Sequence, residues 1–180
     1  MITARVLQQI MPTLRADKAA AILPHLIVAA SRFEINAPAR ESAFLAQLAH
    51  ESGGLRYWEE IASGSDYEGR ADLGNTRHGD GRRYKGRGPI QLTGRANYRR
   101  AGAVLNLNLE DNPEQVATHG IGCLVAAWFW ADKKLNELAD EGTEDAFRRI
   151  TRRVNGGYNG WQDRLNYYKR ARAAYGMPPL

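Results

Sequence analysis

The stretch Phe44–Glu60, FLAQLAHESGGLRYWEE, decides the fold and holds the first candidate for chemistry. One stripe of a helix is predicted by residues at the i, i+3, i+4 and i+7 positions, which are Phe44, Gln47, Leu48 and Glu51. Ser52 and the pair Gly53-Gly54 predict the helix end, because glycine readily adopts the left-handed C′ conformation. Burial disfavours the charged form of a carboxyl, so we expect a raised pKa for Glu51. The alternative is a structural glutamate paired with an arginine.

Hydrophobic periodicity and capping residues predict a mainly helical chain. Besides the helix that opens at Pro38, the expected helices cover residues 2–11, 18–33, 94–105, 114–133, 144–154 and 161–175. Asp17, Thr93 and Thr143 are expected at their N-termini, with a kink or break at Pro24. We expect residues 1–180 to form a single domain.

The segment from Leu55 to Gly88 is rich in glycine and has little periodicity, so we expect a long loop. One turn of helix at residues 67–73 and a short β-hairpin could form within it. A loop of this length inside a compact domain is usually functional.

Charge is unevenly distributed along the chain. The formal net charge is +5, whereas residues 77–100 carry +7, residues 143–180 carry +5 and the remainder carries −7. This asymmetry indicates either a polyanionic partner, such as a nucleic acid or an anionic cell wall, or a solvated basic face. Nucleic acid is disfavoured because the chain has no known nucleic-acid-binding motif.

Features that the sequence lacks indicate where the protein is made and whether it binds a metal. Cys123, the single cysteine, lies in an apolar run and is predicted to be a core residue. No apolar run is long enough to span a bilayer and no secretory signal is visible, so we expect synthesis in the cytoplasm and no stable membrane insertion. His50 and His78 have no partners at metal-ligand spacing, and we expect no metal, no cofactor and a monomer.

Three motifs occur in a fixed order: HESGG at 50–54, GRGPIQLTGRANY at 86–98 and VNGG at 154–157. Together they resemble glycoside hydrolase family 19, which contains chitinases and phage or prophage endolysins. The resemblance extends from about Phe44 to Arg170. It implies a lysozyme-like helical domain with two lobes, and hydrolysis of β-1,4-linked N-acetylhexosamine polymers with inversion.

The resemblance also implies roles for particular residues. Glu51 would be the general acid, and Glu60, nine residues later, the general base. Thr93 would position the attacking water together with Asn97, which lies four residues further along the same predicted helix. An inverting hydrolase needs its two carboxyls roughly 6.5–9.5 Å apart, a separation that a helix end and the following loop can supply.

Substrate contacts are expected from residues around these groups. The candidates for sugar binding are Gln91, Asn155, His50, Tyr84 and Arg164, and Tyr57, Trp58 and Trp161 could also stack on sugar rings. Glu68 is the alternative base, and its competing interpretation is a salt bridge to Arg70.

The chain lacks the disulfides of plant members of the family, and Asn159 stands where these tend to have an acid. These departures favour an endolysin that cleaves peptidoglycan glycan strands in the periplasm after release by a holin. The alternatives are a chitinase, a lytic transglycosylase, which uses one glutamate and releases anhydro-sugars, and a non-enzymatic wall or nucleic-acid binder.

Overall fold

The computed structural model describes residues 1–180 and is mainly helical, which confirms the predicted fold class. The α-helices are α1 (Ala4–Ile10), α2 (Ala16–Arg32), α3 (Pro38–Glu51), α4 (Asp80–Arg83), α5 (Arg95–Leu105), α6 (His119–Asp132), α7 (Leu135–Asp140), α8 (Glu144–Asn155) and α9 (Trp161–Ala174). Three short 3₁₀ turns accompany them, η1 (Ser65–Tyr67), η2 (Ala71–Leu73) and η3 (Pro113–Ala117). No helix has both the length and the apolar character needed to cross a bilayer.

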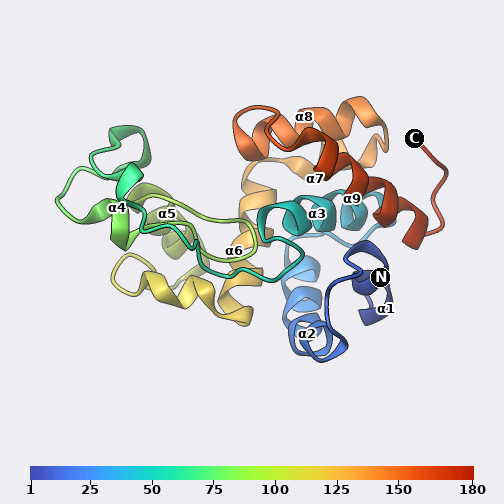
Figure 1. Ribbon diagram of the computed structural model, residues 1–180, viewed down its shortest axis with the longest axis horizontal. Coiled ribbons are helices and arrows are strands. Elements are labelled where there is room, and N and C mark those ends of the chain that lie inside the picture. The colour runs from blue at the N-terminus through green and yellow to red at the C-terminus, as the bar shows by residue number, and fades with distance from the viewer.

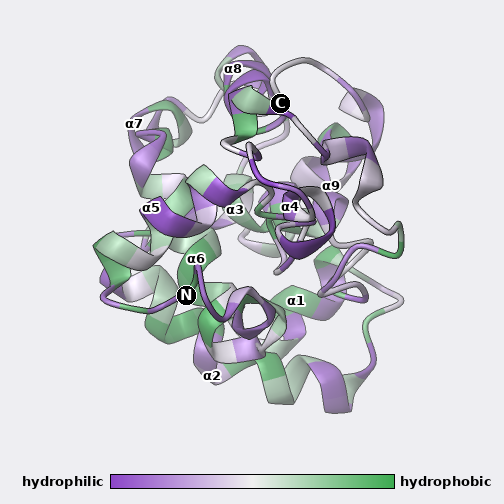
Figure 2. Cartoon of the chain, turned by 90° about the vertical axis from the view of Figure 1, so that its left-hand side faces the viewer, coloured by the Kyte–Doolittle hydropathy of each residue, from purple (hydrophilic) through white to green (hydrophobic).

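The chain forms two lobes of unequal size (Figure 1). The smaller lobe, on the left of the view, contains α4 and α5, and the larger body contains α1, α2, α3, α7, α8 and α9. Helix α6 lies between them, and Figure 2 shows hydrophobic residues along it. One hydrophobic cluster includes Tyr98 of the smaller lobe and Phe44 and Trp130 of the body, so the two lobes share a core.

Helix α3 is buried on every side through its middle, from Glu41 to Ala49, rather than along a single stripe. Three alanines in this stretch allow close packing, chiefly against α9. The ring of Phe44 meets Trp130 edge-on at a centroid distance of 5.3 Å. A helix enclosed in this way is a rigid support for the residues at its C-terminal end.

The single long helix predicted for residues 114–133 is wrong. Thr118 adopts an extended conformation (ψ 151°), which separates η3 from α6. Helix α7 was not predicted, and it begins after Lys134, whose φ of +52° reverses the chain. Side-chain hydrophobicity does not report such single-residue backbone changes.

The predicted N-caps are correct in one case of three. Thr143 accepts a hydrogen bond from the Ala146 N–H and caps α8, as expected. Asp17 lies inside the first turn of α2, and Thr93 precedes Gly94, the residue that starts α5 without a side-chain cap. Helix α2 continues through Pro24 without a break.

The glycine-rich segment forms turns but no strand, so the β-hairpin considered from the sequence is absent. Two isolated antiparallel bridges pair Arg87 with Glu59 and with Leu92. Backbone hydrogen bonds extend this contact, because the Glu60 N–H donates to the Gly86 carbonyl at 2.8 Å. The bridges fix the loop that carries Glu60 against the GRGPIQL segment.

Candidate active site

Glu51 is the last residue of α3, and its side chain is about one-fifth exposed. The helix ends where the sequence predicts, because Gly53 (φ +60°) and Gly54 (φ +77°) adopt the left-handed conformation. Arg164 of α9 places Nη2 at 2.6 Å from Oε1 of Glu51. The arginine partner considered from the sequence is therefore present. The ion pair lies at the C-terminal end of α3, where the Glu51 side chain reaches the protein surface.

Arg164 is itself held beneath this surface, with 1% of its area exposed. Its Nη1 donates to Oε1 of Gln47 at 2.5 Å, and its Nε donates to the Asn159 carbonyl at 3.1 Å. The Gln47 amide in turn donates to Thr151 Oγ1 at 2.9 Å. A buried guanidinium needs such partners for all of its donors, so this network fixes the position of the Glu51 carboxylate.

A second contact joins the same two helix ends. His50 Nδ1 lies 2.7 Å from Oδ2 of Asp163, so consecutive residues of α3 meet consecutive residues of α9. The imidazole lies against Gly160 (φ +70°), where a Cβ atom would overlap the ring. The glycine is required both by its backbone conformation and by the space that His50 occupies.

Glu60 is held by the loop rather than by a helix. Its Oε1 accepts a hydrogen bond from the Tyr67 hydroxyl at 3.0 Å, and its Oε2 accepts one from the Gly86 N–H at 3.0 Å. Burial, followed by the neighbouring Glu60 carboxylate, raises the pKa of Tyr67. The two hydrogen bonds orient a half-buried carboxylate without a cationic partner.

Gly86 is the point at which several polar atoms converge. A Cβ atom on it would lie 2.7 Å from Oε1 of Gln91, 3.3 Å from Oε2 of Glu60 and 3.4 Å from Oγ1 of Thr93. Gln91 reaches this point with a φ of +55° and donates from Nε2 to the Gly88 carbonyl at 3.0 Å. The missing side chain of Gly86 therefore leaves room among three oxygen atoms.

Thr93 and Asn97 are adjacent, as their spacing predicts, but their contact differs from the expected one. Asn97 Nδ2 donates to the backbone carbonyl of Thr93 at 2.8 Å, and the Thr93 hydroxyl donates to the Gln91 carbonyl at 2.9 Å. The hydroxyl oxygen keeps its lone pairs as acceptors. Thr93 thus lies at the shared point of the site, and Asn97 supports its backbone.

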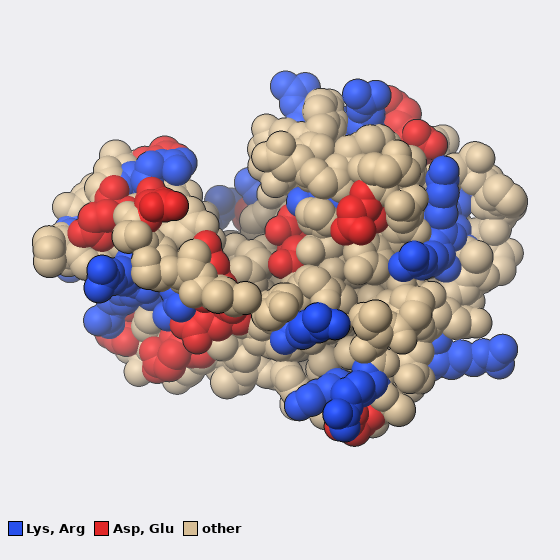
Figure 3. All heavy atoms as spheres, viewed as in Figure 1, with Lys and Arg blue, Asp and Glu red and all other residues tan.

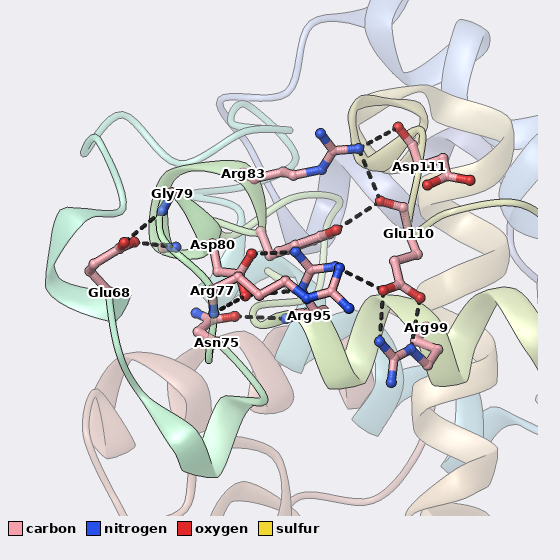
Figure 4. A network of polar contacts seen from close by, with 12 residues as sticks. Glu68, Asn75, Arg77, Gly79, Asp80, Arg83, Arg95, Arg99, Glu110 and Asp111 are labelled. Atoms are coloured by element: carbon pink, nitrogen blue, oxygen red, sulfur yellow. Dashed lines mark hydrogen bonds and ion pairs between the residues drawn. The ribbon is translucent and has the colours of Figure 1, made fainter.

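Glu68 is tied to the backbone, and Figure 4 shows both contacts. Its carboxylate accepts hydrogen bonds from the N–H groups of Gly79 at 2.6 Å and Gly81 at 2.8 Å, which hold its pKa below the usual range. The predicted salt bridge to Arg70 is wrong, because Arg70 pairs with Asp72. Glu68 stabilises the turn that opens α4.

An ion-pair network supports the smaller lobe (Figure 4). Arg95 pairs with buried Asp80 at 2.5 Å and with Glu110 at 2.9 Å. Tyr84 lies beneath this network, 1% exposed, and donates from its hydroxyl to the Glu110 carbonyl at 2.9 Å. A side chain buried in this way presents no face on which a sugar could stack.

The remaining candidates lie apart from Gly86 in the chain. Asn155 is the last residue of α8, and its Nδ2 is enclosed without a hydrogen-bond partner. Tyr57 is 42% exposed, whereas Trp58 is half-buried and donates to the Leu55 carbonyl at 3.0 Å. Trp161 packs against Phe147.

The surface is indented between the smaller lobe and the body, and acidic side chains lie on either side of the indentation (Figure 3). No group of three or more His, Cys, Asp or Glu side chains is placed to hold a metal ion. Sequence reasoning missed Tyr67 and Gly86 as partners of Glu60, and Asp163 as the partner of His50. The sequence gives one indication of the role of Gly86, which is its place in the glycine- and proline-containing segment GRGPIQL. In such a segment the backbone N–H of a glycine can point toward another side chain.

Comparison with known proteins places the chain in a family. The family model described as chitinase class I matches residues 25–140. An endochitinase of Arabidopsis thaliana is 38% identical over 145 residues, covering 77% of this chain and 48% of its own length, so the chain spans about half of that relative. A protein of Haemophilus influenzae named for a glycosyl hydrolase family 19 domain is 30% identical over 162 residues, covering 72% of this chain and 77% of its own.

The solved structures agree on the fold. Chitinase C of Streptomyces griseus superposes with a TM-score of 0.79 over 98% of this chain and 93% of its own, at 24% identity. That identity supports the fold alone, and the family assignment comes from the sequence matches. With its HESGG and GRGPIQLTGRANY motifs at the site described above, this chain belongs to glycoside hydrolase family 19.

Proposed function

We propose that the protein hydrolyses the β-1,4 glycosidic bonds of bacterial peptidoglycan by an inverting mechanism and acts in cell lysis. Glu51 is the general acid, Glu60 is the general base, and Thr93 positions the water that attacks the sugar. The carrying observation is the convergence of Glu60, Gln91 and Thr93 around Gly86, on the loop directly after the helix that ends at Glu51.

The contacts of Glu60 suit a base. The Tyr67 hydroxyl and the Gly86 N–H both donate to it, so they stabilise an ionised acceptor and fix its orientation. A water beside it can donate one hydrogen to Glu60 and the other to the Thr93 hydroxyl oxygen. This arrangement turns a lone pair of the water outward, toward the anomeric carbon of a bound sugar.

The contacts of Glu51 fix the position of its carboxyl group. Arg164 lies at Oε1, and Oε2 accepts no hydrogen bond within the protein. We assign Oε2 the delivery of the proton to the leaving oxygen. The sequence placed Arg164 and Tyr84 among sugar contacts. In this proposal Arg164 is a positioning residue for Glu51, and buried Tyr84 supports the smaller lobe.

Substrate contacts fall to the polar groups that remain available. Gln91 Oε1 is an acceptor at the site, whereas Asn155 Nδ2 is enclosed and would reach a bound sugar only after the side chain turns outward. His50, another candidate sugar contact, is paired with Asp163 beside Glu51 and in this proposal holds the ends of α3 and α9 together.

Peptidoglycan is the proposed polymer because the basic segments at residues 77–100 and 143–180 complement an anionic wall. Chitin hydrolysis is the second candidate, favoured by the name of the Arabidopsis relative, an endochitinase. The lytic role, with synthesis in a host cytoplasm and release to the periplasm by a holin, belongs to the same proposal. Lysis of cells only after their inner membrane is permeabilised would support it.

Glutamine substitutions test the assignment of the glutamates. Glu51→Gln and Glu60→Gln should each lower the rate by about 10²–10⁴-fold, because each removes one proton transfer. Glu68→Gln is the matched control and should lower the rate less than about tenfold, since this residue binds only backbone N–H groups. Melting temperatures identify variants that fail to fold. A folded Glu51→Gln variant with full activity would refute the enzymatic proposal.

The configuration of the product tests the mechanism. Proton NMR of fresh digests should show new reducing ends that are initially in the α configuration, as inversion requires. Initial β product would indicate a retaining enzyme, and anhydro ends would indicate a transglycosylase. Parallel digests of peptidoglycan and of a chitin oligomer separate the two candidate substrates.

A further inference from the structure

A hollow of about 220 Å³ lies beside the loop that joins Glu51 to Glu60, and no part of the proposed mechanism uses it. Its walls come from the α1–α2 connection, from the first half of α2, from residues 54–56 and 58 of that loop and from the start of α6. The loop connects it to the site, because the Trp58 carbonyl accepts a hydrogen bond from the Gly88 N–H at 2.9 Å. A ligand in the hollow would contact the segment that lies between the two candidate carboxylates.

Every charged group that lines the hollow is basic. The basic side chains are those of Arg15, Lys18, Arg56 and His119, and no carboxylate lines it. Arg15 is already paired with Asp17 at 3.0 Å. Lys18 and Arg56 have no carboxylate within ion-pair distance, and the Arg56 guanidinium lies over the ring of Tyr57 at 6.0 Å. Two cations are therefore free to pair with an anion.

The N-termini of two helices lie at the hollow as well. Burial is the main reason that the pKa of His119 is lowered. The first turns of α2 and α6 contribute Lys18 and His119, and neither helix has a side-chain cap at its N-terminus. The positive ends of two helix dipoles thus add to the two free cations.

The floor of the hollow is apolar and small. It is formed by Leu14, Ile22, Leu55 and Trp58. The indole N–H of Trp58 already donates to the Leu55 carbonyl, so the ring offers an apolar surface rather than a donor. The volume suits a compact group, because pockets for drug-sized ligands measure roughly 300–1,000 Å³. A suitable ligand combines a carboxylate with one or two small apolar side chains.

We infer that this hollow binds the carboxylate terminus of a short alanine-containing stem peptide on peptidoglycan. The inference rests on the proposed function and deepens it, because chitin carries no peptide and no carboxylate. Lys18 and Arg56 pair with the carboxylate, and the floor around Trp58 receives the alanine methyl groups. Peptide-bearing glycan strands are therefore better substrates than bare strands.

Direct binding is the first test. The probe is N-acetyl-D-alanyl-D-alanine, and its C-terminal amide is the matched control that lacks the charge. Added to the labelled wild-type protein, the acid should shift the NMR resonances of Trp58, His119 and Lys18, and the amide should bind at least about tenfold more weakly. Equal binding of acid and amide, or shifts located elsewhere, would overturn the inference. This result does not depend on whether the protein is a hydrolase.

Kinetics are the second test. Intact peptidoglycan strands are compared with strands stripped of peptide by an amidase. The double substitution Lys18→Gln with Arg56→Gln should lower the preference for peptide-bearing strands about tenfold, since each partly exposed ion pair contributes up to about fivefold. Activity on stripped strands should stay within about twofold of wild type.

The matched control is Arg5→Gln with Arg32→Gln, which removes two exposed charges that do not line the hollow. It should keep the full preference. An equal loss of preference in both double variants, or an unchanged preference in the Lys18/Arg56 variant, would overturn the inference. If the wild-type protein cleaves neither strand, the proposed function fails, and the binding measurement alone decides about the hollow.

Discussion

Gly86→Ala is a one-carbon change that tests the geometry of the site without altering any titratable group. The new Cβ atom would lie 2.7 Å from Gln91 Oε1 and 3.3 Å from Glu60 Oε2. Real Cβ atoms do not approach oxygen within 3.0 Å, so the Gln91 amide must move, and the Glu60 carboxylate must shift by a few tenths of an ångström. The methyl group also fills the space in which we place the attacking water.

The expected loss of activity follows from this displacement. A misplacement of about 1 Å can cost ~10²-fold in rate, so we expect kcat to fall by about 10–10²-fold. Stability should change by less than about 1 kcal/mol, because the gain of ~0.4–1 kcal/mol from restricting the unfolded chain offsets the side-chain strain. For a chain of this size the melting temperature should stay within about 4 °C.

The assay measures kcat and KM on a chitin oligomer or on peptidoglycan, with thermal unfolding followed by circular dichroism. Gly120→Ala is the matched control, because its Cβ atom would meet only the His25 ring at 3.5 Å, an ordinary contact. That variant should be fully active. Near-wild-type activity of folded Gly86→Ala would refute the arrangement of Glu60 and Gln91 described above. A large loss of stability would show that Gly86 serves the fold instead.

Two further predictions concern ion pairs. Arg164→Met should destabilise the protein by about 3–5 kcal/mol, since it leaves the Glu51 carboxylate and the Gln47 oxygen unpaired. Urea unfolding measures this cost, which should be smaller when Glu51→Gln is also present. Equal costs in both backgrounds would contradict the pairing. The pKa of Glu110 is lowered to about 2, first by Arg99, so the stability that this pair contributes is present above the ordinary value of 4.5 and is lost as the pH falls toward 2. The free-energy difference between wild type and Glu110→Gln should therefore shrink over this range, and a constant difference would exclude the pair as its source.

Local features of the sequence predicted most of the fold. The end of α3 at Gly53, the cap at Thr143 and the end of α8 at Gly156 each depend on one or two residues, and the structure confirms all three. The break at Thr118 was missed, although threonine is a common N-cap residue and Thr118 is the extended N-cap of α6. After the break, α6 packs against η3.

For the candidate site, the sequence named residues but did not predict their contacts. Glu60 and Thr93 were named from motifs, and the structure brings both to Gly86. Glu68 was assigned the wrong partner, because Arg70, two residues away, is closer in sequence than the glycines that bind it. Pairs that join distant segments leave no local trace in the sequence.

The pairs His50–Asp163 and Glu51–Arg164 form a clasp between α3 and α9, and this clasp can close only late in synthesis of the chain. Asp163 lies 113 residues beyond His50, so a ribosome that has completed α3 must still add the whole smaller lobe and α6 to α8 before the clasp can close. Until then the Glu51 carboxylate has no arginine to fix it. A growing chain therefore carries Glu51 long before Arg164 is available to pair with it, and α9 is the last helix that the contact requires.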